Sequence, residues 1–250
     1  MDLSGKTALV TGGARRVGRA TILALAEAGA NVVINYNSSS DTAEQVAEEA
    51  RSFGVEAMIA QADVGEYDQV EKMAKKALSK FGCIDILVNN ASRFKPSPFP
   101  TDDIASWKKT TSILIDGPFY TVNLFAPGMI EKGEGVIVNI VDLSIYESWP
   151  NFGAHVVGKS ALLAFTRQVA LELGPAVRSN AIAPGPVLPP LDYSPEKVQR
   201  TAHKTLLDRW GTPKDVTRTV LFLIESDYIT GEVIVVDGGE RYGHRKHEEG

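Results

Sequence analysis

The sequence predicts an α/β protein with a doubly wound, seven-stranded parallel sheet flanked by helices. Short apolar runs recur along the chain, and segments of roughly 10–20 residues with helical spacing separate them. Most of these runs are continuously apolar, which is typical of strands buried on both faces. Alternating strands and helices favour right-handed crossovers and a single parallel sheet. The predicted strands are residues 7–10, 31–34, 57–60, 84–88, 136–141, 179–183 and 232–236.

Length and charge favour one soluble domain spanning residues 1–250. The chain has 250 residues, 44% of them hydrophobic, which is enough for a sizeable core. Its formal net charge of −5 argues against a nucleic-acid partner, because such proteins usually carry a basic surplus. The start is not signal-like, and no apolar run approaches the roughly 18 residues of a membrane helix. The single cysteine, Cys83, excludes an internal disulfide, so we expect a cytoplasmic protein.

Local signals mark the elements that follow the first strand. Val17, Leu25 and Ala28 lie near one face of a first helix that Gly29 would end. Longer helices are expected over about 102–132 and 151–174, with apolar residues on more than one face.

Two loops and the tail complete the expected organisation. Residues 93–100 and 184–195 are rich in proline, and such loops often shape a site. The segment of about 184–210 is expected to fold over a substrate. The charged tail, 243–250, is expected to fray, and its His244 and His247 are interpreted as solvated, so no metal site is predicted.

A glycine-rich turn joins the first strand to the first helix, with the sequence Thr11-Gly12-Gly13-Ala14-Arg15-Arg16-Val17-Gly18. Glycines allow the backbone to turn tightly and let a pyrophosphate approach the amides at the positive end of a helix. Such a turn alone is a weak signal, but its two arginines strengthen the prediction of a multiply charged anion.

Further motifs identify a family. Asn89-Asn90-Ala91, Lys159, Pro184-Gly185 and Val236-Asp237-Gly238-Gly239 follow the glycine turn at characteristic spacings. Together these motifs resemble the short-chain dehydrogenase/reductase family, which has the Rossmann fold, and the resemblance covers about residues 5–240.

Three features resemble one subgroup of that family, the pteridine reductases. Arg16 stands where most members have the middle glycine of the turn. Ser92 and Phe94 follow the Asn89-Asn90-Ala91 motif, and Asp142 stands where the family has its catalytic serine.

The resemblance implies a nicotinamide cofactor, and the charges expected near its adenosine favour NADP(H). The end of the second strand has no carboxylate that would repel a 2′-phosphate, and Arg15 supplies positive charge. Asp63 resembles the residue that meets the adenine amino group. The implied cofactor-binding residues are Gly12, Arg15, Arg16, Val17, Gly18, Tyr36, Asn37, Ser38, Asp63, Val64, Asn90, Ala91, Ser92, Lys159, Pro184, Gly185 and Val187.

The catalytic positions depart from the family. Lys159 is kept, but His155 stands four residues earlier in place of the tyrosine that transfers the proton. Asp142 replaces the serine, and Leu114 stands where an asparagine is expected. The i, i+4 spacing puts His155 and Lys159 on one helix face, so the imidazole can occupy roughly the place of the phenol.

These residues are compatible with three different functions. In the first, His155 delivers the proton in an NADPH-dependent reductase. In the second, Asp142 and His155 form an acid–base pair for an elimination or isomerisation. In the third, catalysis is lost and the protein binds NADP(H) as a regulator. A nearby Asp142 would favour the imidazolium form of His155 and a nearby Lys159 would disfavour it, and the sequence does not decide between them.

The expected substrate is a planar, nitrogen-rich heterocycle, pterin-like, or a related carbonyl or imine compound. Phe94 offers an aromatic face, Ser92 a hydroxyl, Arg16 a guanidinium and Asp142 a carboxylate acceptor beside His155. Trp149 and Phe152 are open between the pocket and the core. Family relatives commonly form tetramers, so the resemblance also implies a homo-oligomer.

Overall fold

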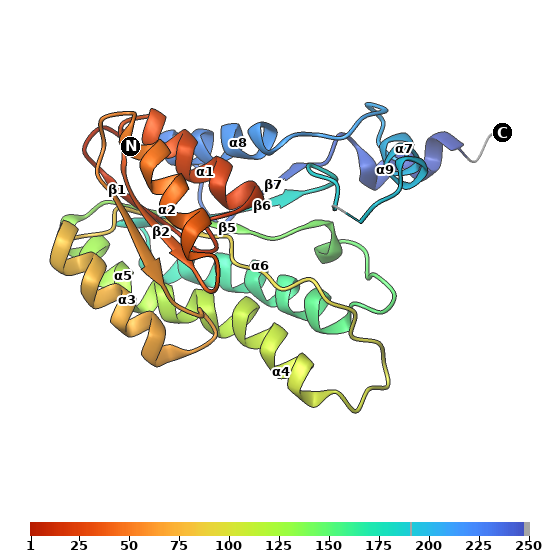
Figure 1. The fold of residues 1–250 in the computed structure, drawn as a ribbon, viewed down its shortest axis with the longest axis horizontal. Coiled ribbons are helices and arrows are strands. Elements are labelled where there is room, and N and C mark those ends of the chain that lie inside the picture. Colours follow the sequence, from red (N-terminus) through yellow and green to blue (C-terminus); the bar gives the residue numbers. More distant parts are fainter. Residues whose placement is uncertain (191, 248–250) are drawn as a thin grey trace.

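The computed structural model describes residues 1–190 and 192–247, and its described strands form a parallel sheet with helices on both faces (Figure 1). The strand order is β3-β2-β1-β4-β5-β6-β7, so the chain reverses its direction of travel between β1 and β4. Ligands of such sheets bind beyond the carboxyl ends of the strands at this reversal. The strands are β1 Thr7–Val10, β2 Asn31–Tyr36, β3 Ala57–Gln61, β4 Ile86–Asn89, β5 Gly135–Ile140, β6 Val177–Pro184 and β7 Val233–Val236.

The predicted doubly wound fold with seven parallel strands is confirmed. β1 has the predicted bounds, and each other strand overlaps its prediction with small shifts at the ends. β6 is longer than the apolar run because its pairing with β5 begins at Val177, and its pairing with β7 continues to Pro184.

Two helical layers cover the sheet (Figure 1). α1, α2 and α8 cover one face and pack around a core that contains Val10, Ile22 and Leu223. α3, α5 and α6 cover the other face, where Phe125 and Met129 are fully buried. The helices are α1 Arg16–Glu27, α2 Ser40–Arg51, α3 Tyr67–Phe81, α4 Ile104–Thr111, α5 Gly117–Lys132, α6 Gly153–Leu173, α7 Pro195–His203, α8 Pro213–Glu225 and α9 Glu240–His247.

α4 and α5 form one continuous stretch through a π-helical turn, η1 (Ser112–Asp116). Asp103 begins this stretch because its carboxylate accepts a hydrogen bond from the Ser106 backbone N–H at 2.9 Å. By length and composition alone, the helix Ile104–Lys132 is long and apolar enough to cross a membrane. The burial of Phe125 and Met129 against the sheet is typical of a core helix instead.

The segment predicted to cover the substrate and the predicted tail both contain helix. The segment 184–210 contains α7, and the Trp210 indole N–H donates to the Val198 carbonyl of that helix at 2.8 Å. The tail predicted to fray from residue 243 is helical as far as His247, because Asp237 caps α9 by accepting from the Arg241 N–H at 3.2 Å. Residues 248–250, and the side chains of His244 and His247, lie outside the described residues.

Phe125→Ala should lower the free energy of unfolding by about 3–5 kcal/mol, because a fully buried aromatic ring leaves a cavity. Urea unfolding monitored by circular dichroism measures this loss. Phe222→Ala is the matched control, because that ring on α8 is 48% exposed and should cost far less. Equal losses for the two variants would contradict the described core.

Candidate active site

A cavity of about 530 Å³ opens beyond the carboxyl ends of the central strands. It lies where the fold predicts a ligand, between the glycine turn and the segments that follow β4, β5 and β6. Its lining residues include Gly12, Arg15, Arg16, Val17, Gly18, Asn90, Ala91, Ser92, Phe94, Asp142, Trp149, His155, Lys159, Pro184, Gly185, Tyr193, Thr201 and Glu240.

Hydrogen bonds fix the glycine turn, and nearby atoms leave no room for a side chain at Gly18. Gly12 has a φ of +62°, and its N–H donates to the Asn35 side-chain oxygen at 3.1 Å. A Cβ on Gly18 would lie 2.2 Å from the Gly12 carbonyl oxygen, so only glycine fits there. The Asn90 amide donates to the Thr11 carbonyl at 2.9 Å and fixes the turn to the end of β4. Sequence reasoning missed Asn35, whose only signal was an amide inside an apolar strand.

Arg16 ties this turn to the loop that was predicted to cover the substrate. Its backbone is left-handed, with a φ of +51°. Its guanidinium donates to the Leu188 carbonyl at 2.7 Å, so the arginine both lines the cavity and anchors its rim. Arg15 remains exposed beside it at the start of α1.

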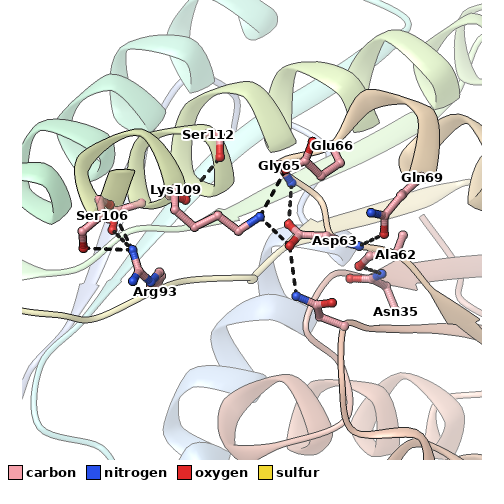
Figure 2. Close-up of polar contacts among 12 residues, drawn as sticks. Asn35, Ala62, Asp63, Gly65, Glu66, Gln69, Arg93, Ser106, Lys109 and Ser112 are labelled. Atoms are coloured by element: carbon pink, nitrogen blue, oxygen red, sulfur yellow. Dashed lines mark hydrogen bonds and ion pairs between the residues drawn. The ribbon is translucent and has the colours of Figure 1, made fainter. Parts of the chain in front are cut away.

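A polar cluster follows the second and third strands, where the adenosine was expected (Figure 2). The buried Asp63 accepts from Lys109 Nζ at 2.6 Å and from the Asn37 amide at 3.1 Å. Burial lowers the pKa of Lys109, but the hydrogen bond and charge of Asp63 outweigh it, so its pKa is raised. Sequence reasoning missed Lys109, because nothing in its local sequence indicates that α4 brings it to Asp63.

Four other residues expected at the cofactor lie outside the lining of the main cavity. Tyr36 is buried at the end of β2, and Ser38 is exposed after it. Val64 packs against Gly117, where an added Cβ would lie 3.1 Å from it. Val187 lines a separate, smaller cavity beside Asp237.

His155 and Asp142 form a direct pair. His155 Nε2 lies 2.6 Å from Asp142 Oδ2, and its Nδ1 lies 3.4 Å from the Arg93 carbonyl oxygen. The other Asp142 oxygen accepts from the Ser144 N–H at 3.0 Å. The imidazole is 2% exposed and the carboxylate 18% exposed, so Asp142 is the member of the pair with more access to the cavity.

The surroundings hold Asp142 in its ionised form. Burial raises its pKa, but the hydrogen bond from His155 and the charge of Lys159 outweigh burial and lower the pKa. Lys159 is buried, and its Nζ donates to the Ile140 carbonyl at 2.6 Å. Burial lowers the pKa of Lys159, and the charge of Asp142 opposes this effect.

The position expected to hold an asparagine carries no polar group. Leu114 is fully buried within η1. It packs so closely against α6 that a Cβ on Gly158 would lie 2.7 Å from its Cβ. This side of the site is therefore sealed by an apolar contact.

Aromatic side chains form one wall of the site. Phe94 is 57% exposed, and it stacks on Phe152 with ring centroids 4.3 Å apart. Its edge meets the His155 ring at 4.9 Å, and Trp149 lies parallel to that ring at 6.1 Å. Trp149 lines the main cavity, whereas Phe152 lines an adjoining cavity of about 530 Å³. The site thus combines a flat apolar wall with an ionised carboxylate.

The glycine turn at a topological reversal, with a polar site beside it, defines a nucleotide-binding α/β domain. A family model described as "Enoyl-(Acyl carrier protein) reductase" matches residues 12–240. The chain belongs to the short-chain dehydrogenase/reductase family and is an oxidoreductase of that family.

Named relatives cover nearly the whole chain. The 3-oxoacyl-[acyl-carrier-protein] reductase FabG of Staphylococcus epidermidis is 34% identical over 239 residues, which cover 94% of this chain and 98% of that protein. A blue fluorescent protein from a metagenomic library, solved in complex with NADPH, has a TM-score of 0.88 and 31% identity, with 96% of this chain and 99% of that chain covered. An NAD+-bound xylitol dehydrogenase has a TM-score of 0.88 and 28% identity, with 96% of this chain and 100% of that chain covered.

Asp142→Asn should destabilise the protein at pH 7 by about 1–3 kcal/mol, because a charge-assisted hydrogen bond is lost. The folded pKa of Asp142 lies below its unfolded value of about 3.9, so this stabilisation is present above that value. It is lost as the pH falls through the lowered folded pKa. Urea unfolding of both proteins between pH 7 and pH 3 should show the difference shrinking at the acid end.

Asp102→Asn is the control for this titration, because Asp102 is exposed. That variant should match the wild-type protein across the whole range. A difference for Asp142→Asn that stays constant down to pH 3 would contradict the ionised pair.

Proposed function

We propose that the protein is an NADPH-dependent reductase that acts on a planar, nitrogen-containing ring, pterin-like, or on a related carbonyl or imine. The observation that carries the proposal is the ionised Asp142, held 2.6 Å from His155 in a cavity with an aromatic wall. A carboxylate at this place accepts hydrogen bonds from N–H groups and stabilises a protonated C=N bond. The resemblance of Arg16, Phe94 and Asp142 to pteridine reductases supports the same substrate class.

The residues present fit NADP(H). Gly12 and Gly18 keep the turn tight at the N-terminus of α1, and both line the cavity, which suits a pyrophosphate. Arg15 is exposed there, and no carboxylate stands at the end of β2 to repel a 2′-phosphate. Asp63, Asn90, Lys159 and Gly185 would hold the rest of the cofactor, as the family resemblance implies. When bound, the cofactor supplies hydride.

The proton in this proposal comes from His155 and Asp142 acting as one unit. His155 Nε2–H donates to Asp142 Oδ2, and the carboxylate is the more exposed member of the pair. In this proposal the imidazolium form of His155, protonated at both ring nitrogens, gives its Nε2 proton to Asp142 as Asp142 gives a proton to the substrate nitrogen. This leaves a neutral imidazole protonated at Nδ1, which lies near the Arg93 carbonyl oxygen. Lys159 lies beside Asp142 and its Nζ donates to the Ile140 carbonyl, so in this proposal it orients the pair.

Reduction of a 3-oxoacyl thioester is the second candidate, because relatives at 34% identity carry that activity in their names. Reduction of a ketone places negative charge on its oxygen, which an ionised carboxylate nearby would oppose. The geometry of Asp142 therefore favours the nitrogen-containing substrate. The two remaining candidates, elimination or isomerisation by Asp142 and His155, and binding of NADP(H) without catalysis, are separated by the experiments below.

The proposal also includes the oligomeric state of the protein and its place in the cell. Apolar side chains on α5 and α6 face outward, with Phe119 50% exposed and Leu171 77% exposed. Faces of this kind commonly mark contacts between subunits, which supports a homo-oligomer of the tetrameric type that the resemblance implies. We place this oligomer in the cytoplasm, without a nucleic-acid or membrane partner.

NADPH should raise the melting temperature of the purified protein, and NADH should raise it much less. A ligand at about 100 times its dissociation constant adds about 2.7 kcal/mol to the free energy of unfolding. Differential scanning fluorimetry with each nucleotide measures the shifts. Arg15→Ala should reduce the preference for NADPH. Equal shifts with NADPH and NADH in the wild-type protein would contradict the assigned cofactor.

His155→Ala should lower kcat by about 10²–10⁴-fold, because the positioned proton source is lost. The assay follows anaerobic NADPH oxidation with dihydropterins, quinones, simple ketones and a 3-oxoacyl thioester. Asp142→Ala should lower turnover of pterin-like substrates and leave NADPH binding within about threefold.

The outcomes separate the candidate functions. Turnover of the thioester alone would replace the proposed substrate with the second candidate. Product formed without net NADPH consumption would support elimination or isomerisation. Firm NADPH binding without any turnover would support a regulator.

A further inference from the structure

Glu240 lines the site but has no role in the proposed reaction. It is the first residue of α9, and its side chain lines both the main cavity and the adjoining one. It is half-buried. Sequence reasoning missed it, because it lies between the Gly238-Gly239 pair and the charged tail and belongs to no motif.

Gly185 allows Glu240 to reach the cavity. A Cβ on Gly185 would lie 3.2 Å from the Glu240 Oε2 atom and 2.8 Å from the Asp237 Cβ. The carboxylate therefore lies directly against the Pro184-Gly185 segment. That segment lines the same cavity as Asp142 and His155.

The Glu240 carboxylate has no direct partner. Among the residues that the structure describes, none forms a hydrogen bond or an ion pair with it. Burial raises its pKa, and the negative charges of Asp237 and Glu147 add to this effect, while Lys204 opposes it from a distance. Asp237, not Glu240, caps α9. A half-buried carboxylate without a direct ion pair gains most from a cationic or N–H-rich ligand.

Cations and carboxylates both line the cavity, and Lys159 is the cation beside Asp142. Arg15 and Arg16 line the end at the glycine turn, while Asp142 and Glu240 line the substrate end. Phe94 and Trp149 supply flat apolar surface beside these two carboxylates. The substrate end thus offers two acceptors and an aromatic wall.

We propose that Glu240 is a specificity-determining residue that binds an amino or amidinium group on the planar substrate. This inference rests on the proposed function for the identity of the reacting ring. Asp142 receives the N–H at the reacting bond, and Glu240 receives a second donor elsewhere on the same ligand. The substrate class is accordingly a planar ring that carries a basic or amino substituent.

Two probes of equal shape test this assignment without turnover. Benzamidine is a planar cation and benzamide is its neutral counterpart, and each is titrated by calorimetry into the NADPH-loaded protein and into the nucleotide-free protein. Glu240→Gln should weaken benzamidine binding by about 10–100-fold, the loss expected for a hydrogen bond between charged groups. It should leave benzamide binding unchanged. Glu240→Asp, which keeps the charge, should retain part of the preference for benzamidine.

The matched control is Glu147→Gln, because Glu147 is exposed and lines only the adjoining cavity. It should leave benzamidine binding within about threefold of the wild-type value. Asp142→Asn is measured in parallel, to show which carboxylate holds the probe.

Several results would overturn the inference. They are no binding of benzamidine to the wild-type protein, equal weakening of both probes by Glu240→Gln, or weakening by Asp142→Asn alone. Loss of NADPH affinity in Glu240→Gln, measured by nucleotide fluorescence, would assign Glu240 to the cofactor instead. Failure of the proposed function is distinguishable, because it appears as absent turnover in the wild-type protein while the benzamidine preference persists.

Discussion

The 2.6 Å hydrogen bond between His155 and Asp142 is the interaction on which the chemistry of this site depends. It joins the end of β5 to the first turn of α6, and it fixes which polar group can meet a ligand. The imidazole is enclosed by Asp142, the Arg93 carbonyl and aromatic rings, so the carboxylate presents the charge of the pair to the cavity. A hydrogen bond of this kind is stronger in a partly buried site than in water.

The rest of the fold supplies the conditions for that pair. Lys159 places a positive charge beside Asp142 while the Ile140 carbonyl holds its ammonium group. Leu114 fills the space behind α6 and excludes polar groups from that side. Arg16 binds the loop at Leu188, and Arg93 binds Ser106 and Thr110 of α4, so both loops at the cavity are anchored to helices. The anchoring orders the site before any ligand binds, which reduces the entropy lost on binding.

The sheet and the glycine turn were predictable because their signals are local. Runs such as residues 86–88 are apolar on both faces, and Gly18 is required by a contact with Gly12 only six positions away. Lys109 and Glu240 were not predictable, because their places depend on where α4 and α9 pack against distant parts of the chain. The spacing of His155 and Lys159 predicts a shared helix face, but not the direction of the imidazole. That direction is set by Asp142 and by the Arg93 carbonyl, which come from other elements.

Two of the departures from the family pattern, Asp142 and His155, make physical sense only when taken together. A carboxylate at position 142 without an imidazole at 155 would be left partly buried with fewer donors, and such a group is costly. An imidazole at 155 without the carboxylate would keep only the long 3.4 Å approach to the Arg93 carbonyl. With both present, burial raises the pKa of Asp142, but the hydrogen bond from His155 and the charge of Lys159 outweigh burial, so the pKa is lowered and the carboxylate stays ionised. A neutral hydroxyl pair can donate a hydrogen bond to a ketone oxygen, whereas this pair presents an acceptor. The proposed preference for nitrogen-containing substrates rests on this acceptor.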